Sequence, residues 1–259
     1  MSMIHYDEYG DRKNPTILLL HGAGALDTFC QQYCFQKQFH LVVPHLCGAG
    51  EAVEELYEPK KQMEALFELI RSLNKEKIGL IGHSLGAQLA LMLICEHPEC
   101  FSCAVLLSAW VNPTERSLKP YLRLAPMMAA MLHWKWLVRL QGHYWNYSKE
   151  QADYMAEYSR HITAEQYRAF FQHTVKLCNY PNYDSLRLPM LAICGSGEVR
   201  DMKRSLELLG RNPSCQTMIL PRSSHDFPMR AADRLNPILL EFMKRYTQDS
   251  FKGEINNEP

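Results

Sequence analysis

The sequence predicts an α/β protein: an open, mostly parallel β-sheet flanked by helices, with a helical segment inserted into it. Short runs of aliphatic and β-branched residues are continuous rather than alternating with polar residues. This pattern is typical of strands that are covered on both faces, as in parallel sheets. Helix-length segments separate the runs, and such alternation predicts right-handed strand–helix–strand units.

The individual elements follow from these runs. Strands are expected within residues 16–22, 40–46, 77–83, 103–110, 190–195 and 216–221. Helices are expected over residues 60–73, 84–96, 202–209 and 229–246. All of these strands are expected to be buried, because each run is apolar throughout.

One connection is too long to be a simple crossover. From Asn112 to about Leu188 the chain is rich in aromatic residues and methionine, with helical periodicity. We therefore expect a helical cap over residues 112–188, inserted into a core formed by residues 1–111 and 189–247. The polar tail, residues 248–259, is expected to have little structure.

Composition limits the possible partners. The chain has 28 basic and 28 acidic residues, so its lack of net charge suggests neither nucleic acid nor an anionic membrane surface as a partner. No run approaches the roughly 18 apolar residues needed to cross a bilayer, and the N-terminal residues lack the apolar stretch of a secretory signal. We expect a cytoplasmic protein that acts on a small molecule, and composition leaves its oligomeric state open.

Cysteine and glycine patterns give no sign of a cofactor or a metal. The nine cysteines include one C-x-x-C pair, Cys100 and Cys103, without the second pair or nearby histidines that a zinc site requires. We interpret them as structural thiols at a helix-to-strand connection in a reducing compartment. Phosphate-binding, dinucleotide-binding and H-E-x-x-H motifs are also missing, so no cofactor is expected.

A nucleophile motif stands out in the segment IGLIGHSLGAQLALML. Gly82 and Gly86 bracket Ser84 in a G-x-S-x-G pattern between an apolar strand and an immediate helix. This context is that of a nucleophile elbow, which raises the serine hydroxyl above the sheet edge. It leaves the backbone N–H of Leu85 at a helix N-terminus, where an anion can bind. An ordinary tight strand-to-helix turn is the alternative interpretation.

From about Tyr6 to Tyr246 the chain resembles the α/β-hydrolase family. The motifs that carry the resemblance are LLLHGAG, VVPHLCGAGEA, GHSLG, LPMLAICGSGE and RSSHDFPM. In that family the residue after His-Gly supplies an oxyanion donor, which here implies the backbone N–H of Ala23. Together with the N–H of Leu85 it would form a hole with two donors.

The resemblance also implies a base for the serine. A serine hydroxyl needs a base within hydrogen-bond reach, and His225 follows the last predicted strand, as the family order of serine, acid and histidine requires. His21 and His83 are the alternatives. Both correspond to motif residues that usually support loops, so His225 is preferred.

The acid of the triad departs from the family pattern. The family usually has aspartate three residues after the glycine that closes the penultimate strand, but counting from Gly195 gives Glu198. The extra methylene of glutamate shifts the carboxylate, and Asp201 lies only three residues further on. We prefer Glu198 and keep Asp201 as the alternative acid. Its role would be to fix the tautomer of His225. Both acids could instead be solvated in a charged loop.

The substrate pocket is expected in the cap. Aromatic and methionine residues at helical spacing mostly pack inward, but some must face the serine. Trp110, Met127, Met131 and Trp134 are the candidates for an apolar pocket that fits a small or medium group next to one reactive carbonyl.

These residues favour a serine hydrolase of carboxylic esters. Carbon–carbon bond hydrolysis, thioester hydrolysis and amide hydrolysis use the same machinery, because all attack a carbonyl. An alternative of another class is a non-catalytic module that keeps the fold and binds a ligand in the pocket.

Overall fold

The computed structural model describes residues 4–255, and the side chains of residues 4–247. Its strands are β1 (Tyr6–Tyr9), β2 (Thr16–Leu20), β3 (His40–Pro44), β4 (Ile78–His83), β5 (Phe101–Leu107), β6 (Met190–Gly195) and β7 (Cys215–Leu220). Its α-helices are α1 (Pro59–Ser72), α2 (Leu85–Glu96), α3 (Glu115–Leu132), α4 (Lys135–Tyr144), α5 (Lys149–Tyr158), α6 (Ala164–Gln172), α7 (Arg200–Leu209), α8 (Phe227–Arg230) and α9 (Ala232–Ile255).

The strands form one sheet in the order β1-β3-β2-β4-β5-β6-β7. β1 pairs antiparallel with β3, and the other neighbours pair in parallel. The fold class predicted from the sequence is therefore confirmed. The order places β4 in the middle of the sheet, so the residue that follows it lies at the centre of the sheet's carboxyl edge.

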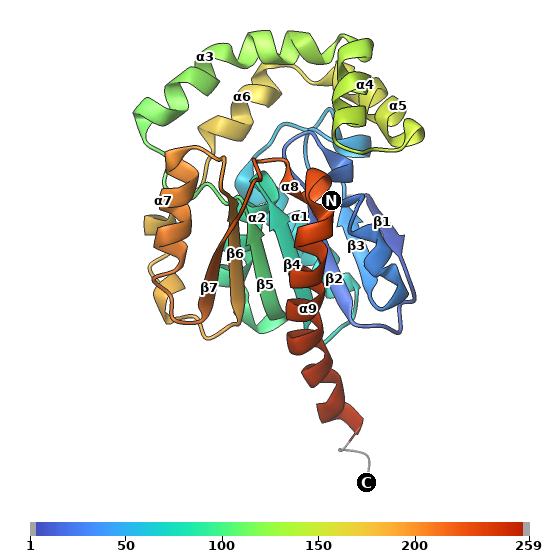
Figure 1. Cartoon of the computed structure of the whole chain (residues 1–259), viewed down its shortest axis with the longest axis vertical. Coiled ribbons are helices and arrows are strands. Elements are labelled where there is room, and N and C mark those ends of the chain that lie inside the picture. The colour runs from blue at the N-terminus through green and yellow to red at the C-terminus, as the bar shows by residue number, and fades with distance from the viewer. Residues whose placement is uncertain (1–3, 256–259) are drawn as a thin grey trace.

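Helices cover both faces of the sheet (Figure 1). Leu18 and Leu20 of β2 pack in one apolar cluster with residues of α1, α2 and α7. Ile17 and Leu19 point the other way, into a second cluster with residues of α8 and α9. This alternation explains why the whole strand is apolar: successive side chains face opposite layers, and both layers exclude water.

The helices α3, α4, α5 and α6 form a layer across one end of the sheet, opposite the end from which α9 projects (Figure 1). They all lie between β5 and β6 in the chain, within the segment that the sequence predicted as a cap. Thr114, Ser148 and Thr163 begin α3, α5 and α6 with capping boxes, in which the side chain accepts a hydrogen bond from a first-turn backbone N–H. Such caps each contribute about 1 kcal/mol and fix where a helix begins.

Several sequence-based expectations need correction. β7 is an edge strand whose four middle residues are exposed, so the prediction of a strand buried on both faces is wrong there. β1 was not predicted, because it is short and polar. The helix expected over residues 229–246 is divided at Ala231 into α8 and α9. α9 also continues to Ile255, into the predicted tail, and residues 256–259 lie outside the described part.

All nine cysteines are free thiols, and Cys103 is fully buried in β5. Within residues 4–255, no group of three or more histidine, cysteine or acidic side chains is arranged to hold a metal ion. No helix in the same range combines the length and the apolar character that crossing a membrane requires.

Candidate active site

Ser84 occupies a strained turn between β4 and α2. Its backbone has φ 54° and ψ −114°, a region that residues with a side chain rarely adopt. Such strain costs on the order of 1–3 kcal/mol and persists only where the surrounding structure enforces it. The central strand and a helix that is buried along all but its last residue enforce it here, and they hold the hydroxyl at the carboxyl edge of the sheet.

The two glycines beside Ser84 allow the strand and the helix to approach closely. A Cβ atom on Gly86 would lie 1.9 Å from the carbonyl oxygen of Leu20 in β2. A Cβ atom on Gly82 would lie 2.3 Å from the carbonyl oxygen of Gly86. Both distances are far shorter than a nonbonded contact permits, so the G-x-S-x-G pattern is a packing requirement of this turn.

A chain of hydrogen bonds joins Ser84 to a buried carboxylate. His225 Nε2 lies 3.0 Å from Ser84 Oγ, and His225 Nδ1 lies 2.9 Å from Glu198 Oε2. A carboxylate can only accept, so Nδ1 carries the proton and Nε2 accepts the proton of Ser84. The histidine side chain is 51% exposed, whereas that of Glu198 is 2% exposed. The imidazole of His225 is thus accessible from solvent, and the carboxylate of Glu198 is not.

Glu198 is held by two further donors. Its Oε1 accepts hydrogen bonds from the backbone N–H of Gly195 and from Ser108 Oγ, both at 2.7 Å. Burial by itself raises the pKa of this carboxyl group. The hydrogen bond and charge of His225, followed by the bonds from Gly195 and Ser108, outweigh that effect and lower the pKa of Glu198 below its usual range. Glu198 is therefore ionised at neutral pH.

Ser108 is a site residue that the sequence analysis missed. It follows β5, is 1% exposed and has a φ of 50°. Its only sequence signal is its position at the end of a strand adjacent to β4. Asp201, the alternative acid, lies in the first turn of α7, where its backbone carbonyl accepts a hydrogen bond from Ser205. The imidazole nitrogens of His225 are paired with Ser84 and Glu198 instead.

His83 and His21 support the loops around the site. His83 Nε2 donates a hydrogen bond to the backbone carbonyl of His225 at 2.8 Å. His21 Nδ1 donates to the carbonyl of Gly22 at 2.7 Å, and its Nε2 accepts from the N–H of Leu46. Burial lowers the pKa of His83 and lowers that of His21 to about 4, so both rings are neutral at pH 7.

The loop of residues 22–26, called the 22–26 loop below, follows β2 beside the site. Thr28 Oγ1 accepts a hydrogen bond from the N–H of Gly22 and donates one to the carbonyl of Ala25. Ala23 is exposed within the loop. Among the described residues, neither the N–H of Ala23 nor that of Leu85 donates a hydrogen bond to another group. Both N–H groups are therefore available as hydrogen-bond donors.

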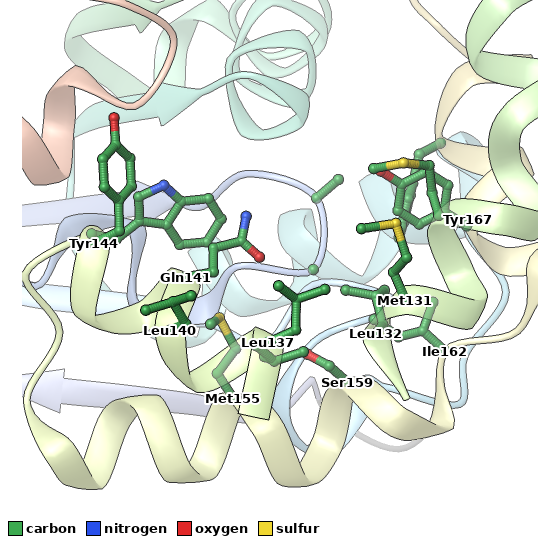
Figure 2. Close-up of a pocket in the computed structure, with 16 residues that line it drawn as sticks. Met131, Leu132, Leu137, Leu140, Gln141, Tyr144, Met155, Ser159, Ile162 and Tyr167 are labelled. Atoms are coloured by element: carbon green, nitrogen blue, oxygen red, sulfur yellow. The ribbon is translucent and has the colours of Figure 1, made fainter. Parts of the chain in front are cut away.

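A cavity of about 600 Å³ lies between the cap helices and the 22–26 loop (Figure 2). Its wall is mostly apolar and comes from every cap helix. The lining residues are Ala23, Gly24, Met128, Met131, Leu132, Leu137, Val138, Leu140, Gln141, Tyr144, Trp145, Met155, Ser159, Ile162, Tyr167 and Phe170.

Of the predicted pocket residues, Met131 lines this cavity, whereas Trp110, Met127 and Trp134 do not. Met127 and Trp134 are 52% and 54% exposed, so their side chains lie largely in solvent. Trp110 packs edge-on against Tyr121, beside the core. The prediction that these three residues line the pocket is not supported by their positions.

A mostly parallel sheet with a strained serine after its central strand is the architecture of the α/β hydrolases. Residues 17–238 match the sequence profile of the alpha/beta hydrolase family, and the chain belongs to that family. The resemblance noted in the sequence is thus confirmed.

Individual relatives are distant. The chain is 23% identical over 255 residues to a protein of Caulobacter sp. (strain K31) named "Putative carbamate hydrolase RutD", with 93% of this chain and 94% of the relative covered. It resembles a carboxylesterase of Nitrososphaera gargenis with a TM-score of 0.73 and 21% identity, covering 95% of each chain. It also resembles the enol-lactonase of Burkholderia xenovorans LB400, with a TM-score of 0.75, 18% identity, and 93% and 96% of the two chains covered. At sequence identities of 21% and 18%, the similarity to these two structures shows a shared fold and does not assign their activities to this chain.

Proposed function

We propose that the protein is a serine hydrolase that cleaves a carboxylic ester through an acyl-enzyme on Ser84. The observation that carries this proposal is the hydrogen-bonded chain from Ser84 Oγ through His225 to Glu198, at 3.0 and 2.9 Å. The three residues have the nucleophile, base and acid types of a catalytic triad, in the chain order used by this family. We also propose that the protein is soluble and acts in the cytoplasm.

In this mechanism His225 Nε2 takes the proton of Ser84 as Oγ attacks the ester carbonyl carbon. The carbonyl π-electrons move to its oxygen, which the N–H groups of Ala23 and Leu85 bind; losing one such donor typically costs roughly 10²–10³ in rate. The oxyanion collapses, the C–O bond to the alcohol breaks, and His225 returns the proton to the leaving oxygen. Water then repeats the sequence on the acyl-enzyme and releases the acid. Glu198 stabilises the imidazolium in both steps without taking its proton.

The cavity supports a substrate with an apolar group. It begins at Ala23 and Gly24, beside the proposed oxyanion site, and extends between Met, Leu, Ile and aromatic side chains of the cap. At about 600 Å³ it lies within the size range of sites for small organic ligands. The lining residues whose side chains carry a polar atom are Gln141, Tyr144, Trp145, Ser159 and Tyr167. We infer that a small or medium acyl or ring group occupies it.

Carbamate hydrolysis is a second candidate, because it is the activity in the name of the RutD relative. A carbamate also presents a carbonyl to Ser84, so the same residues would serve. The apolar cavity favours the ester, since a simple carbamate has no group to fill it.

The test combines a probe with a substrate series. A fluorophosphonate should attach to the Ser84 peptide of the wild type and leave Ser84→Ala unlabelled. p-Nitrophenyl acetate, butyrate and octanoate are then compared with unsubstituted p-nitrophenyl carbamate. The proposal expects the highest kcat/KM with an acyl chain longer than acetyl. No label on Ser84 would refute the serine mechanism, and a preference for the carbamate would assign the second candidate.

A further inference from the structure

Tyr158 lies at the last position of α5 in the cap, yet its hydroxyl contacts the 22–26 loop of the core. The hydroxyl donates a hydrogen bond to the carbonyl of Gly24 at 3.1 Å and accepts one from the N–H of Leu26 at 3.3 Å. The residue is 5% exposed, and burial raises the pKa of its hydroxyl. Tyr158 is therefore a neutral side chain that bridges two backbone groups of one loop.

The 22–26 loop has two sets of anchors. Thr28 ties Gly22 and Ala25 to the core. Tyr158 ties Gly24 and Leu26 to the cap. Ala23, whose N–H is a proposed oxyanion donor, lies between these attachment points. The N–H of Ala23 lies in the planar Gly22–Ala23 peptide unit, whose direction is set by the backbone torsions around it. Thr28 restrains this unit directly at Gly22, and Tyr158 restrains the chain one residue further on, at Gly24.

The cap segment that carries Tyr158 is itself held firmly. At the start of α5, Gln151 donates a hydrogen bond to the buried Asp27 at 2.8 Å, three residues after Gly24. After α5, Ile162 is 1% exposed and lies 3.5 Å from the Cβ position at Gly24. Ser159 and Ile162 also line the cavity, together with Ala23 and Gly24. A group bound in the cavity would touch both sides of this junction.

We propose that Tyr158 is a positioning residue that couples the packing of the cap to the direction of the oxyanion donor at Ala23. This inference rests on the proposed ester hydrolysis. Removing the hydroxyl leaves the Gly24 carbonyl and the Leu26 N–H without that partner, and the loop gains freedom at the point where the hole must be rigid. Preorganised donors contribute to the transition state more than to substrate binding.

The test compares Tyr158→Phe with Tyr147→Phe. Tyr147 is a matched control: it is also 5% exposed and packs in the same apolar cluster, and among the described residues its hydroxyl forms a hydrogen bond only with Met229 Sδ, at 3.8 Å. Both substitutions keep the ring and its packing. For Tyr158→Phe we expect kcat to fall roughly 10–100-fold with KM unchanged, by the effect that a misplaced catalytic group typically has. Fluorophosphonate labelling of Ser84 should slow by a similar factor. Tyr147→Phe should stay within about threefold of the wild type.

A measurement that does not need catalysis separates the two proposals. Hydrogen exchange of the Leu26 amide should become faster in Tyr158→Phe than in Tyr147→Phe, because the hydroxyl protects that N–H. Equal exchange and equal kcat in the two variants would overturn the role of Tyr158. A change in KM alone would also overturn it, since it would make Tyr158 a substrate contact. If the wild type is not labelled at Ser84, the proposed function fails, while the exchange result still decides whether Tyr158 anchors the loop.

Discussion

Replacing Glu198 with glutamine should remove catalysis by forcing His225 into the wrong tautomer. Three donors point at the carboxylate: Nδ1–H of His225, the N–H of Gly195 and the hydroxyl of Ser108. A glutamine amide has one accepting oxygen and one donating nitrogen. The hydroxyl of Ser108 can rotate, but the N–H of Gly195 is fixed, so the amide oxygen stays there. The NH₂ group then faces His225, whose Nδ1 must become an acceptor.

In that tautomer the proton of His225 lies on Nε2 and points at Ser84 Oγ, so the ring cannot take the serine proton. An amide in place of the triad acid elsewhere keeps the geometry and lowers kcat about 10⁴-fold for this reason. A 10⁴-fold loss corresponds to about 5 kcal/mol of transition-state stabilisation, at 1.36 kcal/mol for each factor of ten. KM should change little, because Glu198 is buried behind His225 and away from the substrate.

The assay is steady-state hydrolysis of p-nitrophenyl butyrate by the wild type, Glu198→Gln and Asp201→Asn. Asp201→Asn is the matched control: it makes the same chemical change three residues further along the chain, and we expect kcat within about threefold of the wild type. Full activity in Glu198→Gln together with loss of activity in Asp201→Asn would show that the acid has been assigned to the wrong residue.

Three further predictions follow from packing and charge. Leu137→Trp should fill part of the cavity and lower kcat/KM for p-nitrophenyl octanoate at least tenfold more than kcat/KM for p-nitrophenyl acetate. Met127→Trp is the control: Met127 is exposed and does not line the cavity, so the ratio of the two kcat/KM values should stay unchanged. Gly86→Ala should lower the free energy of unfolding in urea by about 3 kcal/mol or more, because the added Cβ would lie 1.9 Å from the backbone of β2. Gly197→Ala is the control: the atom nearest to its added Cβ is 3.2 Å away, so the loss should be less than about 1 kcal/mol. The pKa of Glu198 is lower in the folded state, so the stability that its ionised carboxylate contributes is complete above the ordinary pKa of 4.5 and is lost as the pH falls below 4.5. The difference in unfolding free energy between the wild type and Glu198→Gln should therefore shrink as the pH falls below 4.5. A difference that stays constant would contradict this prediction.

The fold was predictable because its signal is local. Each buried strand is a continuous apolar run, and strands alternate with helices, which is enough to imply a parallel sheet. Parallel strands also bring the loops at their carboxyl ends to one edge. The proximity of Ser84, Glu198 and His225 follows from that geometry once the strands are known, although their catalytic roles remain proposals. The edge position of β7 was not predictable, since strand order does not appear in a single run of residues.

The prediction of Met127 as a cavity residue was wrong because α3 carries large apolar residues on both faces. Met127 and Met128 are neighbours in the chain, yet Met127 is 52% exposed and Met128 lines the cavity. Successive residues on a helix point about 100° apart, so composition cannot choose between them unless one face is polar. Met131, three residues after Met128, lies on the same face of α3 and also lines the cavity.

The contacts that tune the site are those between residues far apart in the sequence. Ser108 reaches Glu198 across 90 residues, and Tyr158 reaches Gly24 across 134. Neither serine nor tyrosine at these positions belongs to a motif, because a hydrogen bond of this kind requires only that two elements lie side by side. In the proposed mechanism the cap sequence would act on the reaction at two levels: its apolar residues shape the cavity, and the hydroxyl of Tyr158 holds the loop that carries the proposed oxyanion donor. Substitutions in α5 that loosen its packing without touching the cavity should then lower kcat, whereas those that only reshape the cavity should change substrate preference.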